Sequence, residues 1–174
     1  MPGFTLIELV IVIAMLGMLT ALVFPALTPM RDRAERVVCI GNLRSLYVSL
    51  NTYLIDNKHW PQVPDDIDQT QLPKFWVQAL SNYGATEKVW TCPSLKRRYT
   101  EKPENFLEYP EIHYMPGEFD ANPLTPHKWP AMPWAMEIGS MHGDGNMIIR
   151  ADGGLRNLND LLKEAGGEGV HALQ

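Results

Sequence analysis

Positive charge and cysteine are both scarce in this chain of 174 residues. Its 15 Lys and Arg residues are outnumbered by 20 Asp and Glu residues, which gives a formal net charge of −5. A chain without a basic excess lacks the electrostatic footprint of a nucleic-acid-binding protein, so we exclude nucleic acid as a partner. The two cysteines, Cys39 and Cys92, allow one internal disulfide and no more.

Recognisable patterns of catalytic residues are also missing. The sequence has no Ser-His-Asp or Cys-His order, no phosphate-binding loop and no nucleotide-binding fingerprint. Four of its histidines show no metal-ligand spacing, namely His59, His113, His127 and His171. The sequence therefore predicts a protein that is not an enzyme.

Charge is almost absent from the first 30 residues. Between residues 4 and 30 the only charged side chain is Glu8, within an apolar run of about 20 residues that matches the ~30 Å core of a bilayer. The chain start is not basic, and no small-x-small cleavage site follows the run at Phe24-Pro25. We therefore expect a membrane-spanning helix in preference to a removed signal peptide.

An amphipathic helix is predicted directly after this run, extending to about residue 56. Its apolar positions recur at steps of three and four, namely Val37, Ile40, Leu43, Leu46, Leu50 and Tyr53. Because proline removes a backbone donor and crowds the preceding turn, we expect a kink at Pro25.

The rest of the chain predicts a small head of mixed structure. We expect a proline-rich loop from 59 to 73, a short helix from 74 to 85 and short strands at 87–92, 112–115 and 134–138. Two apolar runs flank Asp152-Gly153, which predicts a two-residue hairpin turn of type I′, and a last helix covers 159–165. The predicted class is α+β, with a long N-terminal helix packed on a small antiparallel sheet.

The segment Gly3-Phe4-Thr5-Leu6-Ile7-Glu8 and the apolar run that follows it resemble the processing site of type IV prepilins and type II secretion pseudopilins. The resemblance implies cleavage after Gly3 by a prepilin peptidase and methylation of the new amino terminus at Phe4. It also implies self-association into a filament through the N-terminal helix, aided by an inner-membrane assembly machinery. Pro25 falls where such subunits usually carry a helix-breaking proline.

This resemblance offers an explanation for Glu8. A carboxylate within a bilayer is costly and is seldom left without a partner. In the similar systems this glutamate meets the positive amino terminus of another subunit, which sets the register of otherwise apolar contacts. The alternative is a glutamate at a helix N-terminus, favoured there by the helix dipole.

A second resemblance covers the C-terminal part. His142, nine intervening residues and then Asp152-Gly153 resemble the H-x9-DG motif of a bacterial prepilin-type family, and the sequence around Cys39 and Cys92 fits the layout of that group.

The prepilin resemblance also bears on the cysteines. It implies that Cys39 and Cys92 reach an oxidising compartment, where a disulfide between them persists. Such a bridge closes a loop with 52 intervening residues, which the chain-entropy treatment rates at roughly 4 kcal/mol. Two independent buried thiols are the alternative.

No cofactor is predicted, and two weak cation candidates stay open. Asp65, Asp66 and Asp68 form an acidic cluster compatible with calcium, although the glycine and distal glutamate of an EF-hand loop are missing and a solvated loop is favoured. Asp144 lies close to His142, and with Asp152 it provides a sparse set of ligands if the hairpin brings them together. A purely structural turn at Asp152 is favoured.

Four segments follow from these features: a leader at 1–3, a membrane and polymerisation helix at 4–29, its amphipathic extension at 30–57 and a head at 58–174. We predict a structural subunit of a pilus-like or pseudopilus filament, held in the bacterial inner membrane before assembly and periplasmic or on the cell surface afterwards. The alternatives are a minor subunit that initiates the filament, and a membrane-anchored cation- or ligand-binding module that does not polymerise.

Overall fold

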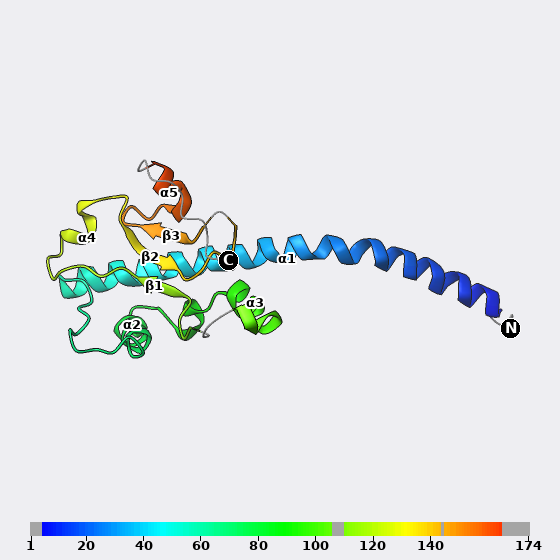
Figure 1. Cartoon of the computed structure of the whole chain (residues 1–174), viewed down its shortest axis with the longest axis horizontal. Coiled ribbons are helices and arrows are strands. Elements are labelled where there is room, and N and C mark those ends of the chain that lie inside the picture. The colour runs from blue at the N-terminus through cyan, green and yellow to red at the C-terminus, as the bar shows by residue number, and fades with distance from the viewer. Residues whose placement is uncertain (1–4, 106–109, 144, 165–174) are drawn as a thin grey trace. The chain divides into compact units, whose positions relative to one another are not determined.

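The computed structural model describes residues 5–105, 110–143 and 145–164 (Figure 1). The chain divides into two compact units, Met1–Ala34 and Glu35–Gln174. Its first element, α1 (Leu6–Asn57), contributes to both units, and each is described by itself below. The prediction that the N-terminal part is helical is confirmed from residue 6 to residue 57, and the helix continues through Pro25, whereas its membrane-spanning character stays a prediction. The predicted kink at Pro25 stays a prediction.

In the first unit, the apolar side chains at the start of α1 are exposed. Between residues 6 and 19, eleven large apolar residues are each at least 46% exposed: Leu6, Ile7, Leu9, Val10, Ile11, Val12, Ile13, Met15, Leu16, Met18 and Leu19. Within the three described ranges, no helix combines the length and the apolar character that crossing a membrane requires.

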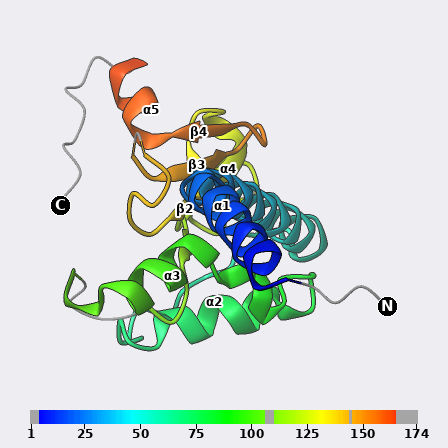
Figure 2. The same cartoon turned by 90° about the vertical axis from the view of Figure 1, so that its right-hand side faces the viewer.

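The second unit is a mixed α and β domain. Its elements after α1 are α2 (Leu72–Ser81), a 3-10 helix (Glu87–Trp90), α3 (Pro93–Glu101), a second 3-10 helix (Pro103–Asn105), β1 (Tyr114–Pro116), α4 (Thr125–Lys128), β2 (Pro133–Glu137), β3 (Met147–Arg150), β4 (Leu155–Asn157) and α5 (Leu158–Glu164). Within this unit, β3, β4 and α5 lie on one side of α1, and α2 and α3 lie on the other (Figure 2).

The core of the second unit forms around one face of α1. Cys39, Leu43, Leu46 and Leu50 are fully buried, whereas Val37 is 67% exposed. The prediction that Val37 belongs to the buried face of α1 is therefore wrong. That face runs through Cys39, and the residue one turn before Cys39 on the same face is Glu35. Four tryptophans fill the space beside this helix, namely Trp60, Trp76, Trp90 and Trp134.

The four strands form one antiparallel sheet in the order β1-β2-β3-β4. Its register aligns Met115 with Met136, Met136 with Ile148, and Ile148 with Arg156. The strands expected at 112–115 and 134–138 and the hairpin at 152–153 are confirmed, each with its ends shifted by one or two residues.

Two local predictions are wrong. The segment expected as a strand at 87–92 is a 3-10 helix followed by α3, because Pro93 occupies the first turn of a helix, where its missing N–H costs nothing. The β3–β4 turn is longer than two residues, with Arg150 N–H donating to the Gly154 oxygen. In that described loop only Gly153 has a positive φ, at +76°, so the turn is not type I′.

Candidate functional site

The start of α1 forms a capping box. The N–H and hydroxyl of Thr5 both donate to Glu8 Oε2, at 2.9 and 2.7 Å, and Glu8 N–H reaches back to Thr5 Oγ1 at 3.4 Å. This reciprocal pairing of Ncap and N3 satisfies donors that a helix start otherwise leaves open. Gly3 and Phe4, the predicted processing residues, lie outside the described residues.

The predicted cation ligands do not gather. Asp65, Asp66 and Asp68 are exposed between α1 and α2, and Asp68 Oδ1 accepts the Thr70 N–H. Asp144 lies outside the described residues. Asp152 pairs with Arg150 at 2.7 Å and accepts the Gly154 N–H. Calcium binding stays a prediction.

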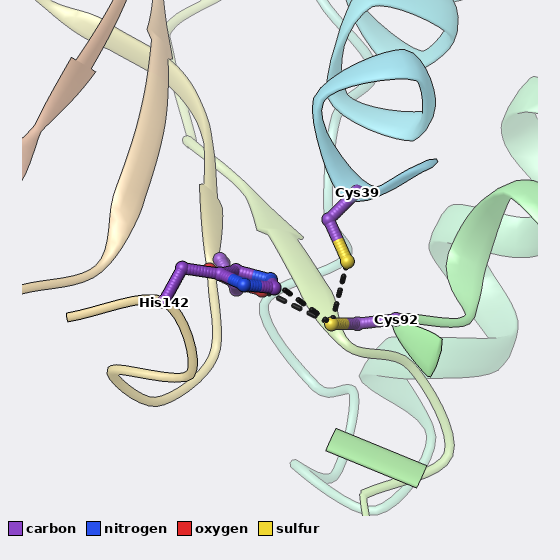
Figure 3. A group of neighbouring side chains, drawn as sticks. Cys39, Cys92 and His142 are labelled. Atoms are coloured by element: carbon purple, nitrogen blue, oxygen red, sulfur yellow. Dashed lines mark hydrogen bonds and ion pairs between the residues drawn. The ribbon is translucent and has the colours of Figure 1, made fainter. Parts of the chain in front are cut away.

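Four other side chains do converge. Across the described ranges, one group of at least three His, Cys, Asp or Glu residues has its ligand atoms within 4.8 Å of one another, and it consists of Cys39, Cys92, Glu137 and His142. We refer to these four residues as the thiol cluster. Figure 3 shows Cys39 and His142 approaching Cys92 from different segments of the chain.

The distances within the thiol cluster are short. The two sulfur atoms lie 2.8 Å apart, and the Cys92 thiol donates to Glu137 Oε1 at 3.1 Å. His142 Nε2 lies 3.7 Å from the Cys92 sulfur and 3.3 Å from Glu137 Oε1. All four residues lie in the second unit, so the geometry belongs to one compact body.

Each member is held by a different element. Cys39 belongs to the buried face of α1, Cys92 is the N-cap of α3, and Glu137 is the last residue of β2. His142 lies in the loop between β2 and β3. Both cysteines and Glu137 are fully buried, and the His142 side chain is 4% exposed.

Burial and mutual contact shift the titration of these groups. Burial by itself lowers the pKa of His142, but its hydrogen bonds to Cys92 and Glu137 and the charge of Glu137 outweigh burial and raise the pKa to about 9. The hydrogen bond between the thiols lowers the pKa of Cys39, and the same bond together with burial raises the pKa of Cys92.

Neighbouring groups fix the thiol cluster in place. The N–H groups of Ser94 and Leu95, in the first turn of α3, donate to the sulfurs of Cys39 and Cys92 respectively. The Cys92 N–H donates to His113 Nδ1 at 2.8 Å. Glu137 Oε2 is buried and has no hydrogen-bond partner among the described residues.

The H-x9-DG residues separate in the structure. His142 joins the thiol cluster, whereas Asp152-Gly153 forms the β3–β4 turn, with β3 between them. No sequence pattern indicated that Glu137 belongs to a site, and none indicated that His142 contacts a cysteine. No spacing rule would have found this set, because its members come from four separate segments.

The arrangement brings together the two cysteines for which a disulfide is predicted. Cys39 and Cys92 lie side by side, as a disulfide requires, and both are free thiols in the structure. The disulfide itself stays a prediction. Chemically, the four groups present two sulfurs, one imidazole nitrogen and one carboxylate oxygen to a common centre.

Comparison with known proteins finds relatives in one secretion pathway. No protein-family model matches the chain, and no solved structure matches it. The type II secretion system core protein G of Pseudomonas aeruginosa is 35% identical over 66 residues, covering 38% of this chain and 46% of that protein. The proteins of the same name from Pectobacterium carotovorum and Escherichia coli K12 are 39% and 36% identical over 59 residues, covering 34% of this chain and 38% and 41% of their own lengths.

These relatives bear the name of a secretion-system component, and none of the three is named as an enzyme. The chain spans less than half the length of each of them. Over about a third of its length, it is therefore similar to the type II secretion system core protein G.

Proposed function

We propose that this chain is a structural, non-catalytic subunit of a type II secretion pseudopilus or a related pilus-like filament. The observation that carries the proposal is the beginning of α1, where exposed apolar side chains surround a helix that starts with the Thr5–Glu8 capping box. The similarity to type II secretion system core protein G supports it.

The apolar side chains of residues 6–19 provide the driving force for assembly. Burying apolar surface is worth about 25 cal/mol per Å², and these side chains are largely exposed in the single chain. Packing the same helix of many copies side by side covers that surface. Before assembly, we propose, the inner membrane covers it.

Glu8 gives the assembly its register. Apolar contacts slide easily past one another, whereas a carboxylate held away from water pairs with one fixed position. We propose that its partner is the amino terminus of a neighbouring subunit, exposed when a prepilin peptidase cleaves after Gly3 and methylated at Phe4. The peptidase and the inner-membrane assembly machinery are then the partners of the chain, and the finished filament is periplasmic or on the cell surface.

The proposal is tested on material sheared from the envelope of cells that express the full chain. We expect electron microscopy to show filaments, and mass spectrometry of those filaments to find this chain beginning at methylated Phe4. A surface-assembled protein that begins at Met1, or beyond Pro25, contradicts the processing step. Envelopes with processed chain but no filaments contradict the structural role.

A second candidate function is a membrane-anchored ligand-binding module that does not polymerise. The observation that favours it is the thiol cluster, because the chain gathers four potential ligands inside the second unit. Under this alternative the chain stays as single copies in the membrane fraction, so the shearing experiment separates the two functions.

A further inference from the structure

We propose that Cys39, Cys92, Glu137 and His142 bind one divalent transition metal ion of the zinc class, as a four-coordinate structural site. The inference rests on the contacts within the second unit and does not depend on the proposed function. A filament subunit and a non-polymerising module would both hold the ion in the same way.

The spacing of the ligand atoms approaches that of a tetrahedral zinc site. Zinc–sulfur bonds of about 2.3 Å and zinc–nitrogen or zinc–oxygen bonds of about 2.0–2.1 Å give tetrahedron edges of about 3.6 Å from sulfur to nitrogen and about 3.3 Å from nitrogen to oxygen. The observed distances are 3.7 Å from the Cys92 sulfur to His142 Nε2 and 3.3 Å from His142 Nε2 to Glu137 Oε1.

Two edges are shorter than the tetrahedron requires. The sulfur atoms lie 2.8 Å apart, against about 3.8 Å in a zinc site, and the Cys92 sulfur lies 3.1 Å from Glu137 Oε1, against about 3.6 Å. Both short edges involve the Cys92 sulfur. A change in the cysteine side-chain torsions that separates the sulfurs by about 1 Å opens the centre of the thiol cluster.

The donor set selects the kind of ion. Two thiolates and one imidazole prefer zinc and chemically similar ions, whereas magnesium and calcium prefer sites made of oxygen ligands. Four protein ligands also fill the coordination of a tetrahedral ion, and no position remains for water or substrate. The ion therefore has a structural role.

The surroundings suit thiolate ligands. The Ser94 and Leu95 N–H groups that donate to the sulfurs lie at the N-terminus of α3, where the helix dipole favours negative charge. Glu137 Oε2 is a buried carboxylate oxygen without a hydrogen-bond partner in the described structure, and a bound cation compensates its charge. Such outer contacts orient metal ligands and tune their basicity.

A disulfide between Cys39 and Cys92 is the competing use of the same sulfurs. It makes no use of Glu137 or His142, which then pair only with each other, at 3.3 Å between His142 Nε2 and Glu137 Oε1. A metal ion makes use of all four converging side chains, whereas the bridge uses the two sulfurs alone. The convergence of the four side chains therefore favours the ion over the bridge.

The test uses the full chain in detergent, with its thiols reduced and its metal removed by a chelator. Cobalt(II) is then titrated in as a spectroscopic probe. We expect one cobalt per chain, the charge-transfer band of a cobalt–thiolate and the visible bands of a tetrahedral ion, all abolished by added zinc. A reduced and folded chain that takes up neither ion overturns the proposal, and its reoxidation to a Cys39–Cys92 disulfide would favour the bridge.

Paired variants locate the ion. The His142→Gln and Cys39→Ser variants are each expected to weaken cobalt binding by more than about tenfold, since even changes to the supporting contacts of a metal site cost ~10–100-fold. His127→Gln is the matched control, because His127 is exposed and lies outside the thiol cluster. Undiminished uptake in both cluster variants overturns the assignment.

X-ray absorption on the zinc-loaded wild type keeps the test decisive if a variant does not fold. We expect two sulfur and two nitrogen or oxygen neighbours around zinc. A shell of nitrogen and oxygen alone overturns the proposal without the need for any substitution.

Discussion

At the scale of single residues, Glu8 has two roles that one substitution can confuse. Its carboxylate completes the capping box with Thr5 within one chain, and we propose that it also pairs with a neighbouring amino terminus. Replacing Glu8 by an apolar residue removes the cap and the charge together. The two roles need variants that remove one at a time.

The Glu8→Gln variant keeps the cap and removes the charge. A glutamine at this position of a capping box reaches the same backbone N–H, so we expect unchanged helix content by circular dichroism but strongly reduced filament yield by electron microscopy. Thr5→Val does the opposite. It costs the helix about 1 kcal/mol but retains the charge, so filaments should still form. Normal filaments from Glu8→Gln, with few from Thr5→Val, would assign Glu8 to capping alone.

A second residue-scale prediction concerns the ion pair between α1 and α3. Glu35 accepts hydrogen bonds from the Arg97 guanidinium at 3.0–3.1 Å and from the Ser94 hydroxyl at 2.8 Å, and its side chain is only 11% exposed. Arg97→Met removes the charged partner and should lower the free energy of unfolding by about 1.5–3 kcal/mol. Chemical denaturation measures this.

Lys96→Met is the matched control for that change, because Lys96 is exposed on the same helix. We expect its effect to stay within about 0.5 kcal/mol. If both variants lowered the free energy of unfolding by the same amount, the Arg97–Glu35 pair would contribute nothing beyond general surface charge.

At the scale of elements, the spacing of apolar residues predicted those helices and strands that bury one face. Leu43, Leu46 and Leu50 recur at helical spacing and are fully buried, and the strands of the sheet were also placed within one or two residues. Periodicity failed for α3 because its sequence is mostly polar. Its position depends on contacts between Arg97 and Glu35, residues far apart in the chain.

The β3–β4 hairpin gives an element-scale prediction. Gly153 has φ +76°, and a Cβ placed there lies 3.4 Å from the Tyr47 ring of α1. Gly153→Ala should lower the free energy of unfolding by about 1–2 kcal/mol, because a side chain disfavours this backbone conformation. Thermal or urea unfolding is the measurement.

Gly41→Ala provides the contrasting variant. Gly41 lies within α1, and a Cβ there has no atom within 4 Å. Because alanine is more favourable than glycine inside a helix, this variant should raise the free energy of unfolding by about 0.5–1 kcal/mol. A Gly153→Ala variant as stable as wild type would show that the turn accepts a side chain.

At the scale of the whole molecule, the thiol cluster was beyond prediction from spacing. Cys39 and Cys92 are 53 positions apart, and Cys92 and Glu137 are 45 apart. They meet only because α1, the start of α3 and the end of β2 come together in the second unit. Local patterns found the cysteines and His142 separately, but only the tertiary structure brings in Glu137.

The division into two units predicts that the second folds without the first. A fragment of residues 31–174 retains the whole core and the thiol cluster. We expect it to unfold cooperatively by circular dichroism and to remain monomeric by sedimentation, while losing assembly. A fragment without a cooperative transition would show that residues 1–30 are needed for folding.

The sheet of the second unit has a further consequence, for aggregation. An exposed sheet edge is a template on which another chain adds a strand, and crowding many copies together increases that hazard. Both edge strands here have only three residues: β1 ends at Pro116, which has no N–H to donate, and β4 carries the exposed Arg156 at its centre. Many copies of this domain can therefore lie close together without pairing their edge strands into amyloid-like stacks.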